Sequence, residues 1–535
     1  MEAYLCKYKL QDPVSVSCLV YASERRPDER KLLKLTPHGI ELHSPPSSEP
    51  DVLPWSSILG ASESTSSIRR RFLTTYEGTE YGEENEFIVF GCTPKRSVKN
   101  ARGLTSLALA VLPSILTGSN KPEEGVERAL VQWVFRCEDG KGDAVSLRMV
   151  KAIRFFADPR IQVEGNTMEK LLDPYGFVLP RKFMVVINPA GGKGDAQKTY
   201  DQQVAPVLEQ ANVEVETVVT RHAADATEIM ENLCLNQYDC IVAVGGDGLL
   251  SEMLQGLMNR KDWQKAVLQP LGIIPAGSGN GLSASLLSRA GERLEVLNAA
   301  YSLAKGRVQD LDLFSATNSS DKVMYGFLSL EWAFIADVDI KSERYRFFGG
   351  MRFFIATALQ IFGFGQIKFP GRLRYRVAET DAPLPEKYHD TYSPGSMTAQ
   401  PISAFPDKEQ RDEEAEKWLE IQGPFYMFWG MNVSHAAADA HIAPSADISD
   451  GHFHLMLVSG ERYSRLAMAR LMMGIEDGSH LGVDRVQLIR TRAFTIRASD
   501  AEDLICIDGE LFPGPEVNIE VYRALGRVLC LPGNK

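Results

Sequence analysis

The pattern of hydrophobic and polar positions changes twice along the 535 residues. Residues 1–160 hold short β-forming runs between polar, turn-prone stretches, and a helical pattern from Ala144 to Phe156 closes this part. Between residues 182 and 310, buried-strand runs alternate with amphipathic helices. Residues 311–535 are mostly strand patterns without regular intervening helices. This order predicts a β-rich module, then a βαβ domain with a parallel sheet, then a mostly antiparallel β-sandwich.

Two segments differ from these parts in amino-acid composition, one between the first two parts and one inside the last. Residues 161–181 carry Asp-Pro and Leu-Pro turn chemistry and are interpreted as a linker. Residues 378–416 are rich in Pro, Ser, Asp and Glu, which predicts a mobile insertion. In the first module, several strands followed by one helix are similar in pattern to a pleckstrin-homology barrel, which would dock on lipid headgroups or another protein. Its basic triplet Arg69–Arg71 is either a contact to anionic lipid or only a solvated surface.

One stretch of the βαβ region carries a carboxylate at an unusual place. The apolar run from Tyr238 to Val244 predicts a buried strand, and Gly245-Gly246-Asp247-Gly248 then turns the chain into a helix. In a parallel sheet this turn lies at the ligand-binding edge, where N–H groups and the helix dipole favour anions. Asp247 would repel a phosphate there unless it held a metal or took a proton. A plain strand-to-helix connection is the alternative.

Two further strand ends carry glycine-dense polar loops, at Asn188 to Asp195 and at Ala276 to Leu282. All three loops would face the same edge of a parallel sheet and form one rim of N–H donors. The first lacks the Gly-Lys-Ser/Thr ending of a P-loop, and the second lacks the G-x-G-x-x-G spacing of a dinucleotide fold. Together the loops nevertheless predict a polyphosphate site.

Composition indicates which ligands and which cellular location are compatible with this site. The net charge of −12 argues against broad nucleic-acid binding. The eight cysteines are scattered without the spacing of a disulfide framework or a zinc site, which favours a reducing, cytoplasmic location. The N-terminus has no apolar signal core, and the longest apolar run, Leu104 to Leu116, is too short to span a membrane. That run is either a buried helix or an interfacial segment.

Five segments resemble the sphingosine, or long-chain-base, kinases of the diacylglycerol-kinase-like superfamily, over about Lys182 to Leu511. They are Val-Ile-Asn-Pro-Ala-Gly-Gly-Lys-Gly, Gly-Gly-Asp-Gly-Leu-Leu-Ser-Glu, Ile-Pro-Ala-Gly-Ser-Gly-Asn-Gly, the stretch from Leu328 to Arg346, and Asp508-Gly-Glu-Leu. The first three occur across lipid and NAD kinases. The stretch from Leu328 to Arg346 is the one that discriminates between them.

The resemblance implies ATP and Mg²⁺ as cofactors and Asp247 as the catalytic base. It also implies a set of nucleotide contacts in the three loops, at two arginines and in the late Asp-Gly-Glu, with Asp508 serving the Mg²⁺ of ATP. These contacts are Asn188, Gly191, Gly192, Lys193, Gly194, Thr220, Gly246, Gly248, Glu252, Gly277, Ser278, Gly279, Arg346, Arg352, Asp508, Gly509 and Glu510.

For the acceptor, Asp339 matches the family residue that binds the amine of a long-chain base. Asp337 lies two positions away, on the same face if the segment is a strand. Phe334 is a candidate for the hydrocarbon slot, and His480 matches a histidine near the headgroup. The alternatives are solvent-facing turn aspartates, an ordinary core phenylalanine and a loop histidine. Two other histidine pairs offer weaker metal candidates, His435 with His441 and His452 with His454.

The leading hypothesis is a kinase that makes a sphingoid-base 1-phosphate. The alternatives are a diacylglycerol or ceramide kinase, and a catalytically inactive lipid-binding regulator. An acceptor embedded in a bilayer predicts transient, peripheral contact with intracellular or plasma membranes. A homodimer is left open.

Overall fold

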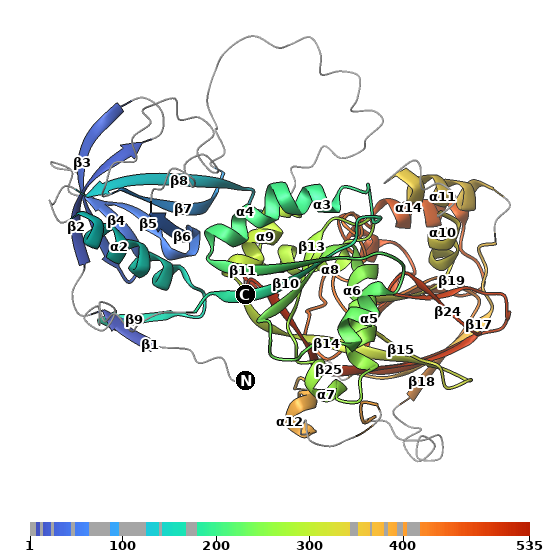
Figure 1. The fold of residues 1–535 in the computed structure, drawn as a ribbon. Helices are drawn as coiled ribbons and strands as arrows, with labels where there is room; N and C mark the ends of the chain where they lie inside the picture. Colours follow the sequence, from blue (N-terminus) through green and yellow to red (C-terminus); the bar gives the residue numbers. More distant parts are fainter. Residues whose placement is uncertain are drawn as a thin grey trace, which may run out of the picture.

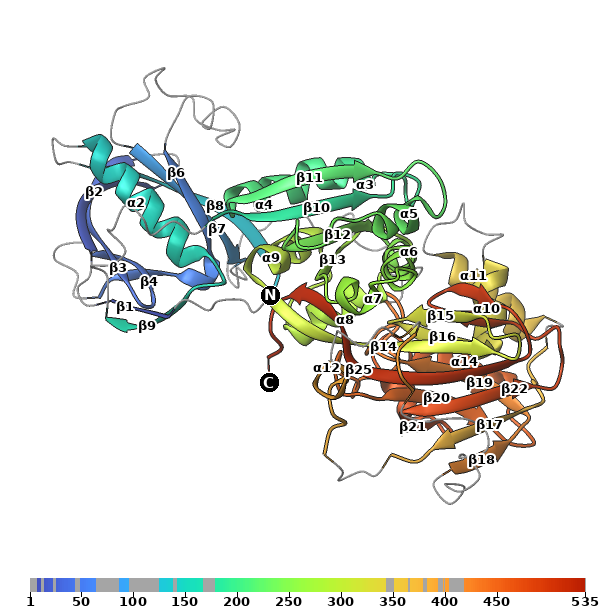
Figure 2. The same cartoon turned by 60° about the horizontal axis from the view of Figure 1, so that its bottom comes forward.

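The computed structural model shows three parts in series (Figures 1 and 2). It describes residues 7–10, 14–22, 26–43, 49–63, 86–95, 125–137, 142–166, 179–342, 351–363, 366–378, 383–392, 398, 400–403 and 418–534. The basic triplet Arg69–Arg71 and the apolar run Leu104 to Leu116 lie outside these residues. No helix in the described part of the chain is both long and apolar enough to cross a bilayer.

The N-terminal module is a seven-stranded antiparallel sheet with one helix packed against it (Figure 1). Its core joins Leu33, Phe87 and Phe135 of the sheet to Ile153 of the helix. The strands are β2 (Val14–Ala22), β3 (Arg26–Thr36), β4 (Gly39–His43), β5 (Asp51–Pro54), β6 (Ile58–Glu63), β7 (Glu86–Pro94) and β8 (Arg128–Cys137), and the helix is α2 (Gly142–Ala157). The prediction of a β-rich module closed by one helix is therefore confirmed.

A two-stranded parallel ribbon lies beside this module. It pairs β1 (Lys7–Leu10) with β9 (Gln162–Asn166). The segment interpreted as a linker from 161 to 181 thus contains a strand, and its last residue, Arg181, already begins β10.

The βαβ region builds a parallel sheet with helices on both faces. Its strands are β10 (Arg181–Ile187), β11 (Val213–Val219), β12 (Cys240–Gly245) and β13 (Leu271–Pro275), in the order β11-β10-β12-β13. Alternate residues face opposite sides, as the period of a strand requires. Val185 and Val242 pack toward α4 (Ala205–Gln210) and α9 (Val296–Lys305). Met184 and Ile241 pack toward α5 (Asp225–Glu231) and α6 (Asp247–Met258).

The parallel sheet continues into the last part of the chain. The long strand β25 (Glu516–Cys530) pairs in parallel with β13 and antiparallel with β14 (Arg307–Asn318) and β22 (Ala493–Ala498). Beyond β22 follow β17 (Gly371–Arg376) and β18 (Trp418–Gln422), and β15 (Val323–Gly326) pairs with β14. The predicted boundary at 310 lies inside β14, because one ten-stranded sheet serves both regions.

A second, six-stranded antiparallel sheet packs on this one and completes the predicted β-sandwich (Figure 2). Phe453 contacts Phe314 and Phe494 of the first sheet, with ring centroids 4.9 and 5.3 Å apart. Its order is β21-β20-β19-β16-β23-β24. The strands are β16 (Ser329–Ala333), β19 (Phe425–Met431), β20 (Phe453–Ser459), β21 (Gln487–Thr491), β23 (Ile505–Ile507) and β24 (Glu510–Phe512).

Three helices lie near the six-stranded sheet, α10 (Phe334–Ser342), α11 (Met351–Phe362) and α14 (Arg465–Met473). The prediction of a strand through Asp337 and Asp339 is wrong, because β16 ends at Ala333 with a left-handed φ of 64° and the chain turns into α10. In a helix, residues two positions apart point about 160° away from each other, because each residue adds about 100°. The two aspartates therefore face different surroundings.

Part of the predicted mobile insertion packs against the domain. It holds the short helix α12 (Tyr388–Thr391), and Tyr388 lies against Tyr522 of β25 and Trp263 of α7 (Trp263–Ala266). The Trp263 indole also donates a hydrogen bond to the Thr398 carbonyl at 2.8 Å. The aromatic residue Tyr388 gives this otherwise polar segment an apolar contact with the domain. The average composition of residues 378–416 did not indicate such a contact.

The N-terminal module is joined to the βαβ domain by a buried ion pair. Arg128 of β8 donates to both carboxylate oxygens of Glu292, at 2.8 and 2.5 Å, and Asn298 of α9 donates to the same carboxylate at 3.0 Å. Lys305, at the end of α9, donates to the carbonyls of Ile58 and Ala157 in the module. Buried charges that are fully hydrogen-bonded fix one arrangement of the two parts.

Breaking this pair is expected to destabilise the contact between module and domain. Glu292→Ala would leave the Arg128 guanidinium buried without its partner, which costs about 3 to 5 kcal/mol. We expect a lower first unfolding transition in urea or on heating. The exposed pair Lys95 with Glu127 at the same contact offers a control, and Lys95→Ala should leave the transition near that of the unaltered protein. Equal effects of the two substitutions would contradict the assignment.

Candidate active site

Three glycine-dense loops meet at the carboxyl edge of the parallel sheet, as predicted. Asn188 donates its N–H to the Val244 carbonyl at 3.1 Å, and Ala276 donates to the Gly245 carbonyl at 3.0 Å. The contact is so close that a Cβ built on Gly277 would lie 2.2 Å from the Gly246 Cα, and one on Gly192 would lie 2.6 Å from the Ala276 oxygen. Glycine is therefore required at these points, and the rim is continuous.

The predicted nucleotide residues in the βαβ domain all lie in or beside this rim. Thr220 follows β11 and donates its N–H to the Ile187 carbonyl at 2.9 Å, which holds it beside the first loop. Lys193 and Ser278 are exposed, and Glu252 is half-buried on α6. A Cβ at Gly248 would meet nothing within 4 Å, so open space lies above the first turn of α6. The first loop holds Asn188, Gly191, Gly192, Lys193 and Gly194, the second Gly246 and Gly248, and the third Gly277, Ser278 and Gly279.

Asp247 is buried at the first turn of α6. Its carboxylate accepts hydrogen bonds from the N–H groups of Gly281 and Leu282, at 2.6 and 3.1 Å, which begin α8 (Gly281–Arg289). Burial nevertheless raises the pKa of Asp247 to about 6, because desolvation of the charge outweighs these hydrogen bonds. A carboxylate with this pKa can take up a proton near neutral pH.

Asp508 reaches the rim from the second sheet. It sits with Gly509 in the β23–β24 hairpin turn, and both residues have positive φ, 50° and 82°, as a type I′ turn requires. Its carboxylate accepts three backbone N–H groups, from Phe327, Leu328 and Ser329, at 2.9 to 3.0 Å. Burial raises the pKa of Asp508 to about 7, and the nearby charge of Asp247 adds to the shift. Glu510 follows on β24 and is exposed.

The predicted acceptor residues are divided between different environments. Asp339 is half-buried on α10. Asp337 forms an ion pair with Lys341 and accepts a hydrogen bond from the Gln360 amide at 3.0 Å. Phe334 is fully buried at the start of α10, in the apolar cluster between sheet and helices.

His480 is buried as well, and its two ring nitrogens face the carbonyls of Gly474 and Ile442, at 3.1 and 3.0 Å. In these contacts it joins two loops of the second domain. Arg346 lies outside the described residues. Arg352 lies on α11, and only its backbone is described.

The histidine pairs show no metal chemistry. His435 and His441 stack with centroids 4.0 Å apart, and burial lowers the pKa of His435 to about 3. His454 instead faces Asp450, at 2.9 Å. Within the described residues, none of these histidines belongs to a group with the spacing of metal ligands.

Glu331 is a candidate that the sequence reasoning missed. It is buried in the middle of β16, and the charges of Asp339 and Asp508 add to the effect of burial in raising its pKa well above the usual range. Asp508 in turn lies near Asp247. Four carboxylates thus run from the glycine rim to α10, and we call them the four-carboxylate series: Asp247, Asp508, Glu331 and Asp339. The signal in the sequence was a lone charge inside the apolar strand pattern Leu328 to Phe334.

Comparison with known proteins finds matches for the βαβ domain and for the β-sandwich. Residues 182–316 match the diacylglycerol kinase catalytic domain, and residues 419–530 match the YegS C-terminal NAD kinase beta sandwich-like domain. Sphingosine kinase 1 of Arabidopsis thaliana is 33% identical over 344 residues, which cover 62% of this chain and 68% of that protein. Sphingosine kinase 1 of Homo sapiens is 31% identical over 364 residues, which cover 66% and 92%. A solved diacylglycerol kinase from Bacillus anthracis str. Sterne is 16% identical, with a TM-score of 0.41, covering 66% and 99%.

The two domain matches place the chain among the lipid kinases with a diacylglycerol-kinase type of catalytic domain. In this chain, that domain is a parallel sheet with a glycine-rich rim, joined to a β-sandwich. The long matches narrow this class further. The chain belongs to the sphingosine kinase family.

The open space above Gly248 yields a test of the rim. Gly248→Ala adds a methyl group that meets no protein atom, and alanine stabilises a helix relative to glycine by about 0.5 to 1 kcal/mol. We therefore expect unchanged or higher thermal stability together with a KM for ATP raised at least about tenfold, because the methyl group occupies phosphate space.

Gly482→Ala serves as the matched control, because a Cβ there also meets nothing within 4 Å. It should change neither stability nor the KM for ATP. An unaltered KM for ATP in Gly248→Ala would contradict the placement of phosphates over the second loop.

Proposed function

We propose that this protein transfers the γ-phosphoryl group of ATP to the primary hydroxyl of a sphingoid long-chain base. The observation that carries the proposal is the buried Asp247, which stands between a rim of backbone N–H groups and the rest of the four-carboxylate series. A phosphate fits the rim, and a cationic acceptor fits the carboxylates. Family membership agrees with both halves of this arrangement.

The nucleotide side needs N–H donors and a cation. The three glycine loops offer the donors, and Lys193 stands exposed among them. Carboxylate oxygens are the ligands that Mg²⁺ prefers, and Asp508 and Glu510 of the hairpin turn offer them at the same edge. When bound, Mg²⁺ neutralises charge on the phosphates. Three N–H groups bind the Asp508 carboxylate and fix the turn that carries the exposed Glu510.

Asp247 is the proposed general base. Its two backbone hydrogen bonds hold the carboxylate at the start of α6, and each oxygen keeps a lone pair that can accept the hydroxyl proton of the acceptor. A base with a pKa of about 6 is ionised at neutral pH and is still basic enough to assist the transfer.

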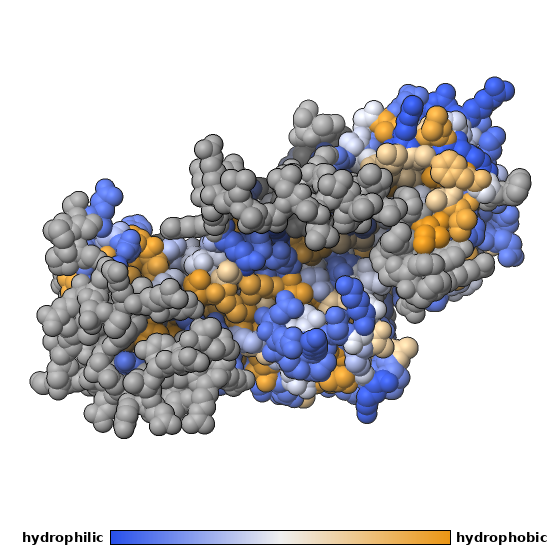
Figure 3. All heavy atoms as spheres, turned by 90° about the horizontal axis from the view of Figure 1, so that it is seen from above, coloured by the Kyte–Doolittle hydropathy of each residue, from blue (hydrophilic) through white to orange (hydrophobic). Residues whose placement is uncertain are grey.

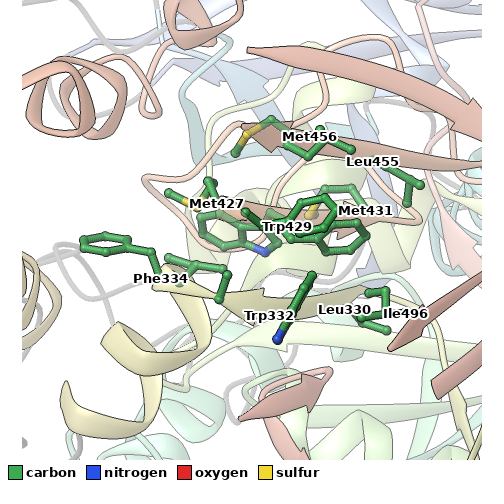
Figure 4. Close-up of a cluster of buried hydrophobic side chains, with 14 of the residues drawn as sticks. Leu330, Trp332, Phe334, Met427, Trp429, Met431, Leu455, Met456 and Ile496 are labelled. Carbon is green, nitrogen blue, oxygen red and sulfur yellow. The ribbon is translucent and has the colours of Figure 1, made fainter. Parts of the chain in front are cut away.

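The acceptor side needs a cation site and an apolar slot. Asp339 is the proposed partner of the ammonium, at the opposite end of the four-carboxylate series from Asp247. The tail would lie in the buried apolar layer between β19 and the helices, where Met427, Trp429 and Met431 lie side by side with Met456 of the neighbouring strand (Figure 4). Methionines adapt to a flexible chain better than branched residues do. Phe334 lines the same cluster.

A membrane surface is the proposed source of the acceptor. The helices α11 and α14 pack together and expose large apolar side chains, Leu359 and Phe362 from the first and Leu466 and Met473 from the second. Apolar surface gathers at that end of the molecule in Figure 3. Exposed apolar groups next to a slot for a lipid favour direct transfer from a bilayer.

The acceptor assignment is tested with radiolabelled ATP and five lipids: sphinganine, sphingosine, phytosphingosine, ceramide and diacylglycerol. We expect transfer only to the three free bases, because only these carry an ammonium for Asp339. Asp247→Asn should lower kcat by about 10²- to 10⁴-fold while the circular dichroism spectrum stays the same. Transfer to diacylglycerol without transfer to the bases would reject the proposal.

The pH dependence tests the role of Asp247 separately. Its raised pKa means that the carboxylate is protonated below about pH 6 and cannot accept the hydroxyl proton there. We expect kcat at saturating substrates to rise with pH through about 6 to 7, since Asp508 titrates at about 7 in the same series. A kcat that is flat between about pH 5 and 8, with product release shown to be fast, would exclude Asp247 as the base.

The membrane contact is tested with lipid vesicles. Replacing both Phe362 and Met473 by Ser should weaken binding to vesicles that contain the base, because these two side chains are highly exposed on α11 and α14. Activity on base dissolved in detergent should remain, which separates membrane contact from catalysis. Leu419→Ser, an exposed apolar position on β18, is the control. Unchanged vesicle binding of the double variant would contradict this surface.

A further inference from the structure

Glu331 stands alone in an apolar row that crosses four strands. In the antiparallel register, it lies directly opposite Cys506 of β23 on one side and Trp429 of β19 on the other, and Trp429 lies opposite Met456 of β20. Directly paired residues point to the same face of a sheet. Because Leu330 and Trp332 occupy the face toward the other sheet, Glu331 points to the face that α10 contacts.

The carboxyl group of Glu331 is buried without being satisfied. The residue is 7% exposed, and its Oε2 atom has no hydrogen-bond partner. The indole N–H of the neighbouring Trp429 lies close enough to lower the pKa of Glu331, yet its Nε1 atom also lacks a hydrogen bond. An unpaired buried carboxyl group destabilises a fold. A hydrophobic residue would suit this row better, so packing does not explain the glutamate.

The surroundings of Glu331 indicate what would satisfy it. Asp339 of α10 and Asp508 of the β23–β24 turn both raise its pKa, and within the described residues no cation is among the groups that shift it. The nearby Lys341 is paired with Asp337. Cys506, directly opposite, is a buried thiol whose pKa is raised by burial and by nearby carboxylates that include Glu331 and Asp339. Among the groups that the structure describes, this position therefore gathers negative charge without a positive partner.

We infer that Glu331 is a specificity-determining residue of the acceptor site, where its Oε2 accepts a hydrogen bond from the ammonium group of the sphingoid base. This inference rests on the proposed function. An ammonium group of a primary amine carries three N–H donors, which is more than one carboxylate such as Asp339 can accept in good geometry. Glu331 and Asp339 together share the cation. Glu331 is close enough to both Asp339 and Asp508 for their charges to raise its pKa.

Sharing the cation has a consequence for selection among lipids. A carboxylate at the surface can be solvated by water, whereas the buried Glu331 carboxyl group is satisfied only by a donor or a cation inside the site. A neutral lipid of the same length brings no cation to its Oε2 atom. Glu331 thus adds discrimination against acceptors without an amine.

The experiment compares the full-length protein with Glu331→Gln, which keeps the shape of the side chain and removes its charge. Steady-state rates are measured with sphinganine and with a straight-chain 1,3-diol of equal length that lacks the amine. Melting temperatures are measured with and without sphinganine. Glu420→Gln on β18, at an exposed ion pair with Arg372, is the matched control and should change none of these values.

For Glu331→Gln we expect a KM for sphinganine that rises about tenfold to a hundredfold, as for loss of a hydrogen bond to a charged group. The KM for ATP should stay within about twofold, and the ratio of kcat/KM between sphinganine and the diol should fall. The melting temperature without ligand should be equal or higher, because a buried unpaired carboxyl group is gone. The upward shift produced by sphinganine should shrink.

Three results would overturn the inference. An unchanged KM for sphinganine in an active variant would remove Glu331 from the acceptor site. A KM for ATP that rises together with the KM for sphinganine would assign it to the nucleotide or its metal. A large fall in the ligand-free melting temperature would assign it to the fold. If the unaltered protein transfers phosphate to no free base, the proposed function itself fails. In that case, a rise in melting temperature with sphinganine that is equal in the unaltered protein and in Glu331→Gln would also exclude Glu331 from sphinganine binding.

Discussion

The backbone contact between the Gly246 and Gly277 loops is the constraint on which the site depends. The two loops can touch only because neither carries a Cβ, and their contact brings the first N–H groups of α8 within hydrogen-bonding distance of Asp247. Those N–H groups fix the carboxylate at the rim. The carboxylate is buried there, and burial raises the pKa of Asp247 to about 6.

From this point a chain of like charges extends into the second domain. Asp508 joins the β23–β24 turn to the start of β16, because its carboxylate accepts three backbone hydrogen bonds there. Glu331 lies further along β16, and Asp339 lies on α10, the helix that follows this strand. Desolvated carboxylates that raise one another's pKa destabilise the empty protein. In the proposed function, a metal ion at the phosphates and the ammonium group of the acceptor would relieve this repulsion.

The local sequence was sufficient for the parts of the site that use the backbone. The loops at Asn188, Gly246 and Gly277 were predicted to meet, because strand ends of a parallel sheet share one edge and glycine density marks close approach. The Asp508–Gly509 pair likewise is typical of a hairpin turn. Interpretation failed at Asp337, where a strand pattern ran into a helix. The break there is a single left-handed Ala333, which no periodicity reveals.

What the sequence alone determined is therefore the glycine-dense rim, the order of the three parts and the place of Asp247 at a strand end, since each follows from periodicity and from residue types at strand ends. Only the tertiary structure decided which carboxylates stand together. Glu331 and Asp508 are far apart in the chain and become neighbours because β16 and β23 pair. Asp337 and Asp339 nearly adjoin in the chain and are separated because a helix turns them apart. Which strands pair, and which way a helix turns its side chains, depends on contacts between distant parts of the chain. The pattern of residues along the sequence does not specify these contacts.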